Sequence, residues 1–147
     1  MYKHLLVATD GSKHSDKAVT QAIALASKLG ARLTAFYAAP DFPEPMYAEG
    51  IIYERIPRED YTAAADADAR RILGKVVRKA AAARVPCDTR HAISSVPWEA
   101  ILAAAKKARC DAIVMGSHGR GGLAAFLLGS ETQRVLAHSK LPVIVVR

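Results

Sequence analysis

The chain has 147 residues, of which 51% are hydrophobic and 24% are charged, as in an ordinary globular domain with one core. No segment approaches the ~18 consecutive apolar residues of a membrane-spanning helix, and the first residues do not form a signal peptide, so we expect a cytoplasmic protein with no membrane contact. The net charge is +7, but the basic residues are scattered and only 6% of residues are aromatic. We therefore interpret the charge as a solvated basic surface and do not expect nucleic acid as a partner.

Apolar runs alternate along the chain with segments of helical periodicity. Strands are predicted at residues 3–9, 31–38, 88–93, 111–115 and 141–146. Helices are predicted at residues 18–29, 58–84, 97–107 and 131–139. This alternation indicates an α/β fold with a parallel sheet and right-handed crossovers, formed by a single domain over residues 1–147.

Residues 40–57 interrupt the alternation. They contain four prolines and Gly50, which predicts a long loop without a regular element. Connections of this length are often lids or binding loops, and a passive excursion is an equally good interpretation.

The most informative stretch follows the apolar strand that ends at Met115 and runs from Gly116 to Ser130. Its many glycines tolerate positive φ and allow a ligand to approach the backbone amides. Ser130 and Gln133 match a capping box, which predicts a helix N-terminus with Ser130 as the cap. Exposed amides beside the positive end of a helix form an anion site, most often for phosphate.

Two known phosphate-binding motifs do not describe this stretch. The GxxxxGK[ST] spacing of a P-loop is missing, because no lysine follows Gly129. Residues 119–124 formally fit GxGxx[GA], but a dinucleotide-binding fingerprint belongs to the first βα unit and needs an acidic residue ~20 positions later. That region holds Ser139 and Lys140 instead.

The reactive side chains form no catalytic pattern that the sequence reveals. Cys87 and Cys110 are far apart and not in CxxC spacing, so we expect reduced thiols near strand starts. His118 has no second ligand at metal-binding spacing. The other histidines are expected to be structural or exposed: His4, His14, His91 and His138.

The spacing Gly116-x2-Gly119-x9-Gly129-Ser130 resembles the nucleotide-binding signature of the universal stress protein family. The resemblance extends over residues 5–12, 111–122 and 136–147. It implies a three-layer α/β/α sandwich with a five-stranded parallel sheet of order 3-2-1-4-5, commonly dimeric. It also implies that the chain belongs to the subset of the family that binds ATP.

By the same resemblance, Asp10 contacts the ribose or a phosphate-bound metal, with Thr9 nearby, and Ala38 offers its backbone to adenine. Arg120 is either a phosphate contact or a solvated side chain. The expected cofactor is ATP, or ADP or AMP, with Mg²⁺ at Asp10. The other expected contacts to ribose and phosphates come from the glycine-rich stretch: Met115, Gly116, His118, Gly119, Gly129 and Ser130.

The chain departs from the family pattern at Glu131, where family sequences commonly have valine. A carboxylate there either meets the phosphates as an unfavourable like charge or points to solvent, where a helix start favours it. We predict a homodimer through the last strand, Val143–Val146, because an apolar edge strand tends to pair.

Three functions remain open. The first is a small regulatory stress-response protein that binds an adenine nucleotide and is not an enzyme. The second is a slow ATPase or phosphotransfer enzyme that uses the same pocket. The third is a dimeric interaction module that has lost nucleotide binding, for which Glu131 is the main argument.

Overall fold

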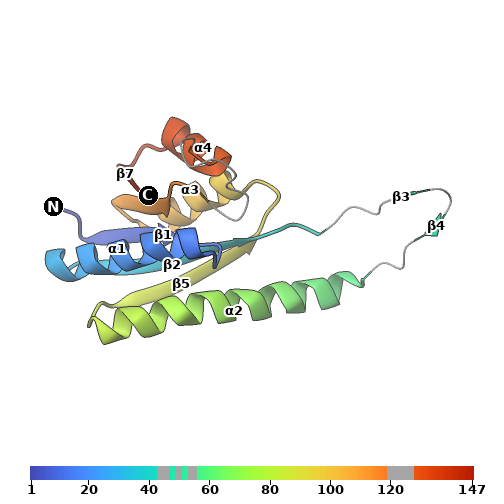
Figure 1. Cartoon of the computed structure of the whole chain (residues 1–147), viewed down its shortest axis with the longest axis horizontal. Helices are drawn as coiled ribbons and strands as arrows, with labels where there is room; N and C mark the ends of the chain where they lie inside the picture. Colours follow the sequence, from blue (N-terminus) through green and yellow to red (C-terminus); the bar gives the residue numbers. More distant parts are fainter. Residues whose placement is uncertain (43–46, 49–50, 53–55, 119–127) are drawn as a thin grey trace.

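The computed structural model describes residues 1–42, 47–48, 51–52, 56–118 and 128–147. Five parallel strands form one sheet in the order β5-β2-β1-β6-β7, which confirms the order 3-2-1-4-5. The strands are β1 (His4–Ala8), β2 (Arg32–Ala39), β5 (Cys87–Ile93), β6 (Ala112–Gly116) and β7 (Val143–Val146). The helices are α1 (Lys13–Leu29), α2 (Arg58–Ala82), α3 (Pro97–Ala108) and α4 (Ser130–His138). Figure 1 shows the neighbouring strands β5, β2 and β1 of this sheet, with α2 alongside.

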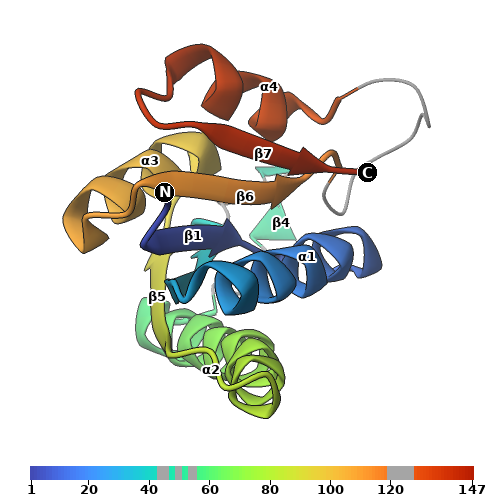
Figure 2. The same cartoon turned by 90° about the vertical axis from the view of Figure 1, so that its left-hand side faces the viewer.

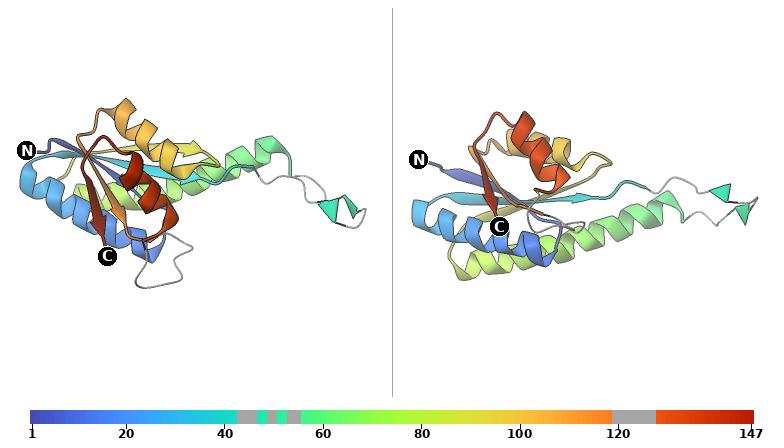
Figure 3. Two further views of the ribbon diagram at one scale, coloured as in Figure 1. Left: turned by 90° about the horizontal axis from the view of Figure 1, so that it is seen from above. Right: turned by 45° about the horizontal axis from the view of Figure 1, so that its top comes forward.

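The sheet is the middle layer of three. Figure 2 shows α1 and α2 on one face and α3 and α4 on the other, and α1 and α2 stay side by side in both views of Figure 3. Alternate residues of each strand supply the two cores: on β1, Leu5 and Val7 pack toward α1 and α2, whereas Leu6 packs toward α3. The predicted three-layer sandwich is therefore confirmed.

Local signals explain where α1 begins and ends. The hydroxyl oxygen of Ser12 accepts a hydrogen bond from the Ser15 amide at 3.2 Å, which caps the helix N-terminus. Gly30 ends the helix in the left-handed conformation at φ 61°, which glycine adopts without strain. The neighbouring helix α2 packs tightly on the β1–α1 turn, where a Cβ at Gly11 would lie 3.0 Å from Ile72.

Two local predictions were wrong. The loop at residues 40–57 contains a two-stranded antiparallel sheet, β3 (Tyr47–Ala48) and β4 (Ile51–Ile52), and all four prolines of the segment lie outside these strands. Ser130 is the first residue of α4 rather than its cap, because the Gln133 amide donates to the Gly129 carbonyl at 3.0 Å. The Gln133 side chain donates instead to the Leu128 carbonyl at 2.7 Å.

Candidate functional site

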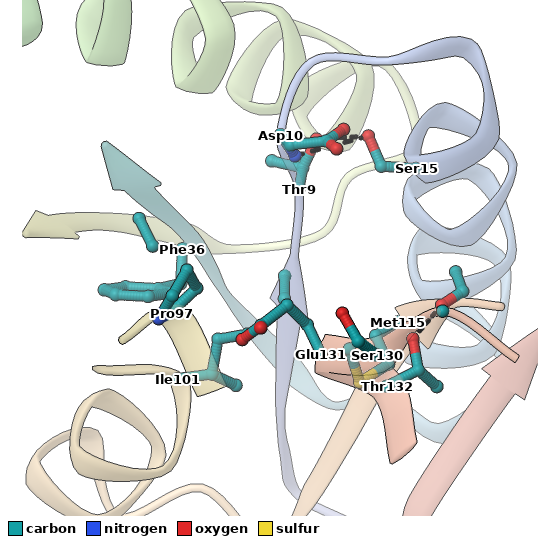
Figure 4. A pocket seen from close by; sticks show the side chains of 14 residues that line it. Thr9, Asp10, Ser15, Phe36, Pro97, Ile101, Met115, Ser130, Glu131 and Thr132 are labelled. Carbon is teal, nitrogen blue, oxygen red and sulfur yellow. Dashed lines mark hydrogen bonds between the residues drawn. The ribbon is translucent and has the colours of Figure 1, made fainter. Parts of the chain in front are cut away.

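A pocket of about 310 Å³ opens at the carboxyl ends of β1, β2 and β6 (Figure 4). The chain crosses from β1 to β2 on one side and later returns to β6 on the other, so β1 and β6 flank the topological switch point. Open α/β sheets bind their ligands at this position. Asp10, after β1, and Gly116, at the end of β6, both line the pocket.

One wall of the pocket is apolar. Phe36 and Ala38 stand two residues apart on β2 and so share a face of the sheet. Met115 from β6 and Ile101 from α3 complete this wall, and all four belong to or border the core beneath α3 and α4. An apolar wall with few polar groups is typical of sites for small organic ligands.

The opposite rim is the turn between β1 and α1, and hydrogen bonds hold its shape. The Thr9 and Ser15 hydroxyls are 2.9 Å apart, and the Thr9 hydroxyl oxygen accepts a bond from the Gly11 amide at 3.2 Å. Asp10 Oδ1 accepts a bond from the Ser12 amide at 2.9 Å. The turn therefore presents a carboxylate and two hydroxyl groups to the pocket in fixed positions.

The far side of the pocket is the N-terminus of α4, which two hydrogen bonds attach to β6. The Gly129 amide donates to the Ser117 carbonyl at 2.7 Å, and the buried Thr132 hydroxyl donates to the Gly116 carbonyl at 2.9 Å. The first amides of a helix have no intrahelical acceptor and carry a partial positive charge. This end of α4 is therefore the part of the pocket best suited to a phosphate or another anion.

The glycines of the site differ in what they require. A Cβ at Gly116 would lie 3.1 Å from the His118 carbonyl oxygen and 3.3 Å from that of His14, so a side chain here would require this backbone to shift by a few tenths of an ångström. Gly129 has φ −58° and ψ 148°, a conformation open to any residue. Positive φ is therefore not the reason for a glycine at position 129.

Glu131 makes a contact that the sequence alone did not predict. Its Oε2 accepts a hydrogen bond from the Trp98 amide at 2.8 Å, at the N-terminus of α3. That helix begins with Pro97, which has no N–H, and its cap residue Val96 makes no side-chain cap bond. The carboxylate caps α3 from α4, and Glu131 still lines the pocket (Figure 4).

Most of the residues singled out from the sequence line the pocket: Thr9, Asp10, Ala38, Met115, Gly116, Gly129, Ser130 and Glu131. His118 is not one of the lining residues, and its Nδ1 lies 3.0 Å from the Ser117 hydroxyl. Gly119 and Arg120 lie outside the described residues. A role for His118 in binding therefore gains no support from this geometry.

Six lining residues were not expected: Ala8, Ser15, Phe36, Pro97, Ile101 and Thr132. Phe36 could have been found, because it shares the period-two face of Ala38. Pro97 and Ile101 could not, since their proximity depends on where α3 crosses the sheet. Among the described residues, no three His, Cys, Asp or Glu side chains come together as a metal site, and no helix is long and apolar enough to cross a membrane.

The fold and the pocket define a class: a doubly wound α/β protein with a pocket at the switch point. The chain belongs to the universal stress protein family, whose model matches residues 1–147. A universal stress protein of Thermus aquaticus, from the QAH/OAS sulfhydrylase 3′ region, is 34% identical over 150 residues that cover 100% of both chains.

Solved structures show the same fold. The MJ0577 protein of Methanocaldococcus jannaschii superposes with a TM-score of 0.80 at 22% identity, covering 99% of this chain and 96% of that one. A universal stress protein in complex with cAMP superposes with a TM-score of 0.71 at 28% identity, covering 99% and 97% of the two chains.

Proposed function

We propose that the chain binds an adenine nucleotide in the pocket at the switch point and acts as a regulatory binding protein. The main support is the division of the pocket into an apolar wall around Phe36 and Met115 and a polar side at Asp10 and the N-terminus of α4. This division matches a ligand with a flat apolar base at one end and an anionic group at the other. The cAMP complex of a 28% identical relative adds support.

In this proposal the base lies against Phe36, Ile101 and Met115, with the backbone of Ala38 at its edge. The Asp10 carboxylate receives the ribose hydroxyls, and the phosphate group meets the first amides of α4 next to Gly116. A Mg²⁺ ion that arrives with a di- or triphosphate would meet Asp10, because Mg²⁺ is usually held by one or two carboxylates together with phosphate oxygens.

A binding role is favoured over catalysis by the groups that line the pocket. Phosphoryl transfer needs a positioned metal, an oriented nucleophile and cationic stabilisation of the transition state. The described lining residues include no Lys, Arg or His, and both acidic residues accept hydrogen bonds from backbone amides. We expect any ATP hydrolysis to fall far below the ~1–100 s⁻¹ of kinases. A steady-state assay that gives turnover in that range would favour the enzyme alternative.

The direct experiment is to release the small molecules bound to protein purified under native conditions and to identify them by mass. An adenine nucleotide in the released fraction is the expected result. Calorimetric titration of stripped protein with AMP, cAMP and ATP then gives the affinity of each. Binding of none of these ligands would contradict the proposal and favour an interaction module.

A pocket-filling variant locates the site. Ala38→Leu adds three carbon atoms to the proposed base subsite and should weaken binding of every adenine ligand about tenfold or more. Ala92→Leu is the matched control, because Ala92 pairs with Ala38 in the register of β2 and β5 but does not line the pocket. Equal loss of affinity in both variants would place the ligand elsewhere.

We also propose a homodimer through β7, which forms one edge of the sheet. The carbonyls of Pro142 and Val146 accept bonds from Ile113 and Ser117 on the β6 side. Since parallel ladders use alternate residues, the backbone groups of Val143 and Val145 point outward, where a second copy can pair with them.

A further inference from the structure

The pocket carries two acidic side chains and no basic one among its described lining residues. Asp10 lies on the β1–α1 rim and Glu131 at the start of α4, so the formal charge of this lining is −2. The chain as a whole is basic, with a net charge of +7, so this described lining differs in sign from the molecule as a whole. A ligand with several negative charges meets the Glu131 carboxylate as a like charge.

We infer that Glu131 makes the pocket select adenine ligands of low negative charge, so that adenosine and its monophosphates bind in preference to ATP. The inference rests on the proposed adenine-nucleotide function and names the class of ligand within it. The Glu131 carboxylate lines the same pocket as Ser130, so the negative charges of a di- or triphosphate bound there would act against it.

The carboxylate cannot easily move out of the pocket. Its Oε2 accepts a hydrogen bond from the Trp98 amide at 2.8 Å, and its Oε1 forms an ion pair of 3.5 Å with the exposed side chain of Arg134. If the side chain rotated away, the Trp98 amide would lose its acceptor, because Pro97 and Val96 supply no alternative cap. The negative charge is thus a fixed part of the site.

The same hydrogen bond also limits where phosphates can bind. Two helix N-termini face the pocket, and each would attract an anion. At α3 the internal carboxylate of Glu131 already occupies the Trp98 amide. In this proposal the ligand phosphate binds instead at the N-terminus of α4, a single helix end that suits one phosphate group better than a chain of three.

The deciding variant is Glu131→Gln, which removes the charge and keeps an oxygen that can accept the Trp98 bond. Stripped wild-type protein and the variant are titrated calorimetrically with adenosine, AMP and ATP, with and without Mg²⁺. In the wild type we expect AMP to bind more tightly than Mg²⁺-free ATP. In the variant we expect ATP to gain about tenfold in affinity and adenosine to stay within about twofold, because only the charged tail senses the carboxylate.

Two controls separate charge from shape and from folding. At about 1 M salt the Debye length is about 3 Å, so the increase in ATP affinity caused by Glu131→Gln should shrink if it is electrostatic. Glu131→Ala loses the α3 cap as well as the charge, so its melting temperature should fall below that of Glu131→Gln. An ATP gain in the Ala variant alone would indicate freed space instead of removed charge, and would overturn the inference.

The possible outcomes distinguish failure of this inference from failure of the proposed adenine-nucleotide function on which it depends. An unchanged ratio of ATP to AMP affinity in Glu131→Gln, or tighter binding of Mg²⁺-free ATP than of AMP by the wild type, would overturn the inference and leave the adenine-nucleotide function intact. Failure of the wild type to bind adenosine, AMP and ATP would overturn both.

Discussion

The hydroxyl of Thr132, in the first turn of α4, donates a hydrogen bond of 2.9 Å to the carbonyl of Gly116, the last residue of β6. Both residues line the pocket, and the Thr132 side chain is buried. This bond, together with that from the Gly129 amide to the Ser117 carbonyl, sets the position of the α4 N-terminus relative to the sheet. The position of the α4 N-terminus thus depends in part on one buried hydroxyl.

Replacing Thr132 with Val removes this hydroxyl while keeping the shape of the side chain. The Gly116 carbonyl would then be buried without its partner, which costs about 1–3 kcal/mol of unfolding free energy. We also expect weaker AMP binding, since α4 is released from β6. Thr132→Ser is the control, because it keeps the hydroxyl. Chemical denaturation and calorimetry measure the two effects, and equal stability of the Val and Ser variants would contradict the role of the bond.

Replacing Val145 with Pro tests the dimer. Proline removes the outward N–H at this position, which β6 does not use, so the protein should stay folded and become monomeric. Val145→Thr keeps the N–H and should remain dimeric. Sedimentation at micromolar concentration distinguishes the states. A monomeric wild type, or a dimeric proline variant, would exclude pairing through β7.

The buried imidazole of His4 predicts a pH dependence of stability. Burial, and secondarily the charge of Arg32, lowers the pKa of His4 below its ordinary value of 6.5. The unfolded chain therefore takes up a proton at this residue before the folded chain does, so the stabilisation is complete above pH 6.5 and is lost as the pH falls below it.

His4→Gln should flatten this dependence, because glutamine does not titrate and can still bond to the Thr34 hydroxyl, which lies 2.8 Å from His4 Nε2. Urea denaturation at about pH 8 and about pH 5 gives the change in unfolding free energy for each protein. The other histidines contribute equally to the change in unfolding free energy of the two proteins, so the difference between these changes isolates His4. Identical changes in the two proteins would contradict the assignment.

The thiols should react slowly in the native state. Both cysteines are free, and burial raises the pKa of Cys110 to about 11 and also raises the pKa of Cys87. A thiol with such a pKa is roughly one part in a thousand thiolate at pH 8. Brief iodoacetamide treatment should label at most the half-buried Cys87, as intact mass shows, and Cys87→Ser should take up no label until it is unfolded. Rapid labelling of Cys110 in the native protein would refute this.

The sequence by itself determined the α/β class. It also determined the approximate positions of the five strands of the large sheet and of the four helices α1–α4, because helical and strand periodicities are local properties of the chain. It also indicated an anion site in the glycine-rich stretch from Gly116 to Ser130, whereas Asp10 and Met115 came from the family resemblance. The order 3-2-1-4-5 came from the family resemblance.

Only the tertiary structure decided which groups complete the pocket and what Glu131 does there. Its partner Trp98 is 33 residues away, and the two meet because α3 and α4 pack side by side on one face of the sheet. A carboxylate at a helix start can cap its own helix, bind a ligand or point to solvent, and these options look alike in a sequence. The choice depends on which unsatisfied amide packing brings within reach, here that of an α3 N-terminus that begins with proline and lacks a side-chain cap.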